Sequence, residues 1–144
     1  MSTGVRRSGR AYALQLLYAR DGDPATDVAN AAGQWAADLE LDIEPAAQAF
    51  AKELVAAAAA RGKEIDDLIA SASKNWRIDR MSRVDRNILR LGACELLAFA
   101  DVPVKVVINE AVELAKRFGT AESSAFVNGV LDRIAGAVGR TAES

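Results

Sequence analysis

Apolar residues recur at helical spacing between Pro103 and Gly119. They occupy every third or fourth position and polar residues fill the others, a pattern that predicts one amphipathic helix. Pro103 suits a first helical turn, and Gly119 stands where a left-handed C-terminal cap is expected. The apolar positions of this helix are Val104, Val107, Ile108, Ala111, Leu114, Ala115 and Phe118.

A second apolar stripe follows and predicts a last helix, whose N-terminus residues 122–124 can cap. Phe126 does not belong to this stripe. At about 100° per residue it lies on the side that Glu122 and Arg133 share. Core packing alone does not explain an aromatic side chain in that position. The stripe consists of Val127, Val130, Leu131, Ile134 and Val138.

The first helix is expected to begin within residues 5–9 and to end at residue 20. Towards its N-terminus, leucine gives way to arginine: Arg7 and Arg10 continue the line of Leu14 and Leu17. This change indicates that the stripe has left the core and faces an anionic partner or water.

Three more helices are expected in the middle of the chain. Ser82 and Asp85 resemble a capping box, so one of them should begin near Arg83. Gly62 costs about 1 kcal/mol in a helix interior relative to alanine, and it marks a bend or a break in the longest of the three. Their expected ranges are 27–39, 45–73 and 83–99.

Composition also favours an all-α protein, because 51% of the 144 residues are apolar and only 6% are aromatic. No stretch approaches the roughly 20 apolar residues of a membrane-spanning helix, and the N-terminus lacks the apolar core of a signal peptide. We therefore expect a soluble, cytoplasmic, all-α protein of six or seven helices, with one domain over residues 1–144.

The sequence has no histidine and one cysteine, Cys94. A Cys–His nucleophile and a zinc site built from histidine or several cysteines are therefore excluded. Cys94 lies in an apolar helical segment and is expected to be buried. Trp35 and Trp76 lie beside apolar segments and are expected to pack against them. We expect no enzyme activity, no cofactor and no metal site.

Charge is unevenly distributed along the chain, whose net charge is −2. The first twenty residues contain four arginines and no acidic residue, so any site for a polyanion is local. Residues 74–90 form a second basic run, a pattern that usually indicates a solvated face.

Binding of single-stranded RNA requires cationic groups for phosphates and flat side chains for bases. The chain offers both types of group, in small number. Charge comes from Arg6, Arg7 and Arg10, flat faces from Phe126 and Tyr18, and hydrogen-bonding groups for base edges from Glu122, Ser123 and Asn128.

Several motifs resemble the NusB family of bacterial transcription antitermination factors. They are RRSGRAYALQLLYA at residues 6–19, VDRNILRLGACELL at residues 84–97, DVP at residues 101–103, INEAVELAKRFG at residues 108–119 and FVNGVLD at residues 126–132. The resemblance implies two packed three-helix bundles, an N-terminal subdomain of about residues 1–75 and a C-terminal one of about residues 76–144. It also implies that the first and last helices are neighbours.

The same resemblance implies binding of the boxA element of nascent ribosomal RNA by the arginine-rich segment and the region around Phe126. It further implies a heterodimer with NusE, a small-subunit ribosomal protein, through a face that includes Tyr18 and Asp85. The pair would join an antitermination complex on RNA polymerase. Gly9 interrupts the arginine run and residues 124–125 are less polar than in many relatives, so weak RNA affinity is expected without NusE.

Two other functions stay open at this point. The chain could be a protein-interaction module with no RNA binding of its own, or the RNA-recruiting domain of an rRNA methyltransferase. The second is disfavoured because the chain ends at Ser144 with no cofactor-binding domain. Both a monomer and a homodimer are compatible with the sequence.

Overall fold

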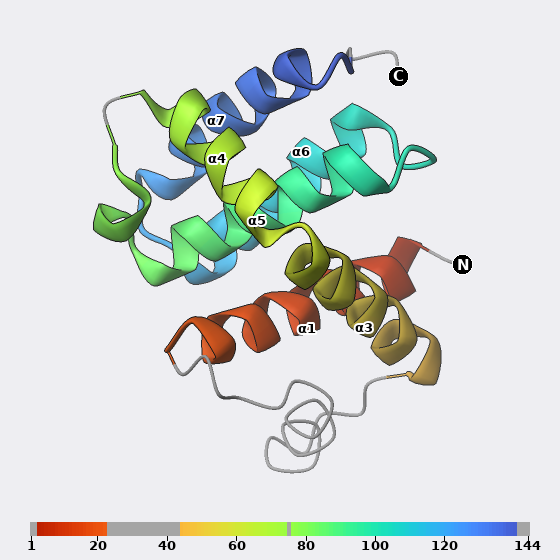
Figure 1. Ribbon diagram of the computed structural model, residues 1–144. Coiled ribbons are helices and arrows are strands. Elements are labelled where there is room, and N and C mark those ends of the chain that lie inside the picture. The colour runs from red at the N-terminus through yellow and green to blue at the C-terminus, as the bar shows by residue number, and fades with distance from the viewer. Residues whose placement is uncertain (1–2, 23–43, 75, 141–144) are drawn as a thin grey trace. The chain divides into compact units, whose positions relative to one another are not determined.

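The computed structural model describes residues 3–22, 44–74 and 76–140 (Figure 1). These ranges contain six α-helices and one short 3₁₀ helix, and no strand occurs within them. The expected all-α class is confirmed. The helix expected at residues 27–39, with Trp35, lies outside the described residues. None of the helices in the described ranges has the length and apolar character needed to cross a membrane.

The chain divides into two compact units, Met1–Ala56 and Ala57–Ser144. The division lies within a helix and earlier than the boundary near residue 75 that the family resemblance implies. Helix α4 (Gly62–Ser73) packs against the C-terminal helices α5 (Arg83–Ala98) and α7 (Ser123–Ala137), so it groups with them.

The first unit contains α1 (Thr3–Gly22) and most of α3 (Pro45–Ala60). The two helices approach closely at Gly9, where a Cβ would lie 2.8 Å from Phe50 Cδ2 and 3.0 Å from the carbonyl oxygen of Ala47. Only glycine permits this approach without displacement of the neighbouring helix. The large buried apolar side chains of the unit are Tyr12, Leu14, Leu16, Leu17, Phe50, Leu54 and Val55.

The second unit is built from α4, the 3₁₀ helix η1 (Ile78–Arg80), α5, α6 (Val104–Phe118) and α7. Helices α5, α6 and α7 pack on one another, and α4 packs on α5 and α7 (Figure 1). Gly92 allows α5 to approach α7, because a Cβ there would lie 2.7 Å from Leu131 Cδ1. Its fully buried large apolar side chains are Ile65, Ile69, Ile88, Leu89, Leu91, Leu96, Leu131 and Ile134.

Two helix boundaries follow the local sequence signals. Ser82 Oγ accepts a hydrogen bond from the backbone N–H of Asp85 at 3.0 Å, which confirms the expected start of α5 at Arg83. The break expected at Gly62 is also confirmed, because α3 ends at Ala60 and α4 begins at Gly62. Short-range hydrogen bonding and glycine placement therefore determine these boundaries.

The left-handed cap expected at Gly119 is wrong. Its backbone is extended, with φ −96° and ψ −164°. Glycine is needed there for a different reason: a Cβ would overlap Ser123 Oγ and lie 2.8 Å from the carbonyl oxygen of Ala115. The chain folds back so tightly after α6 that only a residue without a side chain fits.

Cys94 lies on α5 and is buried, as expected. Burial away from water raises the pKa of its thiol from 9.0 to about 12, with a smaller contribution from the charge of Glu95. The thiol is therefore neutral at ordinary pH, and Cys94 acts as a small apolar side chain.

Candidate nucleic-acid interface

The arginines of α1 have different environments. The guanidinium carbons of Arg6 and Arg10 lie 5.7 Å and 5.6 Å from the centroid of the Phe50 ring. Arg10 is only 2% exposed, so the expectation that the arginine stripe has left the core is wrong for this residue. The close approach of α1 and α3 at Gly9 encloses its side chain, and the aromatic ring stabilises its charge.

Arg7 and Tyr18 are exposed on the same helix, and Tyr18 is 39% exposed. Arg6 is half-buried. The first unit therefore presents a cation at Arg7 and an aromatic ring at Tyr18 to solvent. Arg10 packs inside the unit and is not exposed to solvent.

The turn between α6 and α7 determines the environments of Glu122 and Ser123. Ser123 is 1% exposed, and its Oγ accepts a hydrogen bond from the backbone N–H of Thr120 at 2.9 Å. The expectation that Ser123 reads base edges is therefore wrong, because its hydroxyl is enclosed in the turn. Glu122 is exposed at the N-cap of α7, and its side chain makes no capping hydrogen bond, contrary to expectation. Its Oε2 accepts a hydrogen bond from Thr120 Oγ1 at 3.1 Å.

Phe126 is half-buried on the first turns of α7 and contacts Trp76. The ring centroids are 6.4 Å apart and the ring planes are inclined at 71°, an edge-to-face arrangement. Trp76 packs against Phe126 as a packing residue would, but it is 56% exposed, so this contact covers only part of its side chain. It follows α4 in a non-helical segment.

Asn128 is exposed, but it lies on a different side of α7 from Phe126. Two residues along a helix correspond to a rotation of about 200°. Asn128 lines a groove of 420 Å³ with Lys105 and Asn109 of α6, whereas Phe126 contacts the segment after α4. The structure therefore does not bring Phe126 and Asn128 onto one surface.

Asp85, the residue expected to contact NusE, is half-buried in the first turn of α5. Its Oδ1 is buried and has no hydrogen-bond partner in the part of the chain that the structure describes. A carboxylate oxygen without a donor is costly to bury.

The predicted site residues lie in both units. Arg6, Arg7, Arg10 and Tyr18 belong to the first unit, and Asp85, Glu122, Ser123, Phe126 and Asn128 belong to the second. Sequence reasoning missed Trp76 as a surface group, although its position beside Arg77, in a run rich in basic residues, was an available signal.

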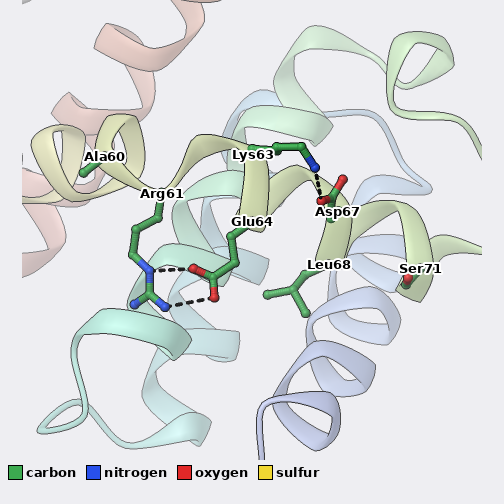
Figure 2. A pocket seen from close by; sticks show the side chains of 7 residues that line it. All are labelled: Ala60, Arg61, Lys63, Glu64, Asp67, Leu68 and Ser71. Carbon is green, nitrogen blue, oxygen red and sulfur yellow. Dashed lines mark hydrogen bonds and ion pairs between the residues drawn. The ribbon is translucent and has the colours of Figure 1, made fainter.

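A larger hollow, of 610 Å³, lies along the exposed side of α4 (Figure 2). Its charged residues are paired with one another: Arg61 donates to Glu64 at 2.8 and 2.9 Å, and Lys63 donates to Asp67 at 2.9 Å. These hydrogen bonds raise the pKa of both Arg61 and Lys63. Because the charges already satisfy one another, this surface is explained as a solvated helix face.

No cluster of three or more potential metal ligands occurs within residues 3–22, 44–74 and 76–140. Exposed arginine and tyrosine side chains on α1, and Trp76 in the segment after α4, instead provide charge and flat apolar area. The fold and these surfaces define a class, that of α-helical binding proteins.

The sequence signature of the NusB family matches residues 7–136, and the chain belongs to this family. The transcription antitermination protein NusB of Myxococcus xanthus is 52% identical over 138 residues, which cover 95% of this chain and 99% of the relative. A solved structure of T. maritima NusB is similar with a TM-score of 0.81 and 37% identity, over 91% of this chain and 90% of that one.

A crystal structure of the antitermination factors NusB and NusE in complex with double-stranded RNA contains another similar chain. The TM-score is 0.83 and the identity 29%, over 94% of this chain and 99% of that one. The all-α fold expected from the sequence motifs is thus the fold of solved NusB structures.

Proposed function

We propose that the protein is a non-catalytic transcription antitermination factor that acts in the cytoplasm. It binds the boxA element of nascent ribosomal RNA together with NusE and joins the antitermination complex on RNA polymerase. The observation that carries this proposal is the family match over residues 7–136, with relatives of that function matched along nearly their whole length.

The N-terminal RNA contacts come from Arg6, Arg7 and Tyr18. Arginine contributes a charge that is independent of pH and a planar group suited to phosphate oxygens. Tyr18 adds a flat, exposed ring on the same helix. Arg10 contributes indirectly, because its enclosed guanidinium and the ring of Phe50 hold the α1 segment that carries Arg6 and Arg7.

The C-terminal RNA contacts come from Phe126 and Glu122, with Asn128 as a separate contact on another side of α7. Phe126 offers a ring for stacking, and the Glu122 carboxylate can accept hydrogen bonds from base amino groups. Asn128 lies beside Lys105 and Asn109, which suits a neighbouring nucleotide or its phosphate. These assignments require an RNA long enough to contact more than one surface.

NusE contacts Tyr18 and Asp85 in this proposal. The half-buried Asp85 carries a negative charge in the first turn of α5, which suits a basic side chain of the partner. Replacement of Asp85 by Asn keeps the shape but removes the charge. We expect Asp85→Asn to weaken NusE binding, with binding of RNA by the protein alone unchanged.

Titration of boxA RNA with and without NusE, over a range of salt concentrations, tests the proposal. We expect binding to be tighter with NusE and to weaken as salt increases. Replacement of both Arg6 and Arg7 by Ala should flatten the slope of log affinity against log salt by roughly 1.4, because each lost phosphate contact on single-stranded RNA contributes roughly 0.7.

Lys63→Ala is the matched control, because this exposed cation is paired with Asp67 on α4 and belongs to no proposed RNA contact. Its salt slope should equal that of the wild type. Absence of boxA binding both with and without NusE would exclude the proposal. Binding that is indifferent to both arginines would exclude the proposed N-terminal contacts.

A further inference from the structure

Trp76 is the most exposed of the large apolar side chains on the described helices and the segments that connect them. At 56% exposed, more than half of its surface is in contact with water, whereas the fully buried side chains of the same unit are under 2% exposed. An indole this exposed contributes little to folding, because much of its apolar area stays in contact with water. A binding role accounts for this position better than packing does.

The backbone of Trp76 is held firmly although its side chain is exposed. Its N–H donates to the carbonyl oxygen of Ser73 at 3.3 Å, and its own carbonyl accepts from Ser73 Oγ at 2.9 Å. Ser73 is 5% exposed, so this anchor lies inside the protein. Arg133 of α7 donates to the carbonyl oxygen of Ala72 and fastens the end of α4 to α7. A backbone fixed in this way loses little conformational entropy when a ligand stacks on the side chain that it carries.

Phe126 supports the indole from one direction only. In the edge-to-face arrangement, the edge of one ring covers part of the face of the other. The remaining open area lies on Trp76, since Phe126 is half-buried. The pair therefore presents a flat surface whose angle is set by the contact between the two rings.

The surroundings of the pair are mostly cationic. Lys74 and Arg77 flank Trp76 and are exposed, and Arg133 is exposed on the side of α7 that carries Phe126. Asp79 pairs with Arg77 at 3.0 Å, and Glu122 is the acidic residue on the Phe126 side of α7. Flat aromatic area among lysine and arginine suits a stacked base with its phosphates.

We propose that Trp76, positioned by Phe126 and anchored through Ser73, is a base-stacking residue for an unpaired nucleotide of the bound RNA. The inference rests on the proposed function and adds to it a contact outside α1 and α7. The ligand chemistry is an unpaired base, with its flanking phosphates near Lys74 and Arg133. Sequence discrimination at this position is expected to be slight, because every base has a π-face.

Fluorine NMR of the full protein labelled with 5-fluorotryptophan tests the inference. The Trp76 resonance is assigned by its loss in Trp76→Phe. We expect this resonance to shift as boxA RNA is added in the presence of unlabelled NusE, with the same midpoint as the change in anisotropy of labelled RNA. Added NusE without RNA should leave the resonance unchanged.

RNA affinities of Trp76 variants provide a second test of the stacking role. Trp76→Ala and Trp76→Leu should weaken RNA binding roughly 5- to 100-fold, the range that corresponds to loss of one stacked base, whereas Trp76→Phe should retain most of the affinity. Circular dichroism should show unchanged helix content. Phe118→Ala is the control, because Phe118 is another exposed aromatic side chain, 38% exposed, with Arg117 over its ring at 4.8 Å.

The outcomes separate this inference from the proposed function. If boxA RNA binds and neither the Trp76 resonance nor the affinity of Trp76→Ala changes, the stacking role is excluded and the antitermination role stands. If Trp76→Leu retains RNA affinity and Trp76→Ala loses only NusE affinity, the residue is a protein contact and the inference is wrong. If no RNA binds, the proposed function itself fails.

Discussion

The guanidinium of Arg10 lies over the ring of Phe50, 5.6 Å from its centroid, and Arg10 is almost completely buried. This contact changes the interpretation of the N-terminal arginines. Arg6 shares the same ring, Arg7 is exposed, and Gly9 allows α3 to approach closely enough for Phe50 to meet both side chains. Arg6 and Arg10 therefore pack against Phe50 of α3, whereas Arg7 is exposed to solvent.

Arg10 and Arg7 should respond differently to truncation. We expect Arg10→Ala to lower the free energy of unfolding by about 2–3 kcal/mol, because it removes a desolvated cation–π contact and leaves a cavity beside Phe50. Arg7→Ala should change it by less than about 0.5 kcal/mol. Urea denaturation measures both. Equal stabilities of the two variants would show that Arg10 is not a structural residue.

Substitution of Gly119 by Ala tests the turn between α6 and α7, and substitution of Gly136 by Ala is its control. A Cβ at Gly119 would collide with Ser123 and Ala115, whereas a Cβ at Gly136 on α7 has nothing within 4 Å. Gly119→Ala should cost about 1–3 kcal/mol. Gly136→Ala should stabilise the protein by up to about 1 kcal/mol through higher helix propensity. Thermal unfolding of both variants gives the comparison, and a stabilised Gly119→Ala would contradict the described turn.

Asp66 and Arg90 join α4 to α5 through two hydrogen bonds, at 2.9 and 3.1 Å. Both side chains are partly shielded from water, at 38% and 23% exposed, so a double-mutant cycle should give a coupling energy of about 1 kcal/mol. The Lys63–Asp67 pair on the exposed side of α4 is the control and should show weaker coupling (Figure 2). Equal coupling in the two cycles would refute the role of Asp66 and Arg90 in joining these helices.

Cys94 should make stability depend on pH in the alkaline range. Burial raises the pKa of its thiol from 9.0 to about 12, so the unfolded chain loses the proton first. The stabilisation is complete below pH 9, and as the pH rises from about 9 towards 12 it is lost at about 1.4 kcal/mol per unit.

Denaturation of the wild type and Cys94→Ala between pH 8 and about 10.5 isolates this effect. The free energy of unfolding of the wild type should fall relative to that of Cys94→Ala as the pH rises, because only the wild type carries the titrating thiol. Tyr12, whose pKa is also raised by burial, is present in both proteins and cancels in the comparison. Parallel curves for the two proteins would show that the thiol is not shielded as described.

Local signals in the sequence predicted much of the fold. The Ser82 cap placed the start of α5, the apolar period of residues 104–118 placed α6, and Gly62 marked the break between α3 and α4. These features depend on hydrogen bonds and side-chain periods within a few residues, which a single sequence contains. Cys94 was placed in the core for the same reason.

The misplaced residues depend on features that helical periodicity does not contain, namely contacts with another helix and the path of the chain at helix ends. Arg10 is buried because α3 supplies Phe50, and Trp76 is exposed because α4 ends before it. Ser123 is enclosed because the chain folds back at Gly119. Helical period assigns a residue to a face but does not identify what covers that face, so the candidate site was predicted less accurately than the helices.

Readthrough of a terminator measures the proposed antitermination activity itself. A template with a boxA element upstream of the terminator is transcribed in a bacterial extract depleted of its own NusB, and the protein is added with NusE. The proposed function predicts that readthrough increases, and that the increase disappears when boxA is scrambled or when Arg6 and Arg7 are replaced by Ala. Readthrough that does not respond to the protein, or that increases equally with the scrambled element, would contradict it.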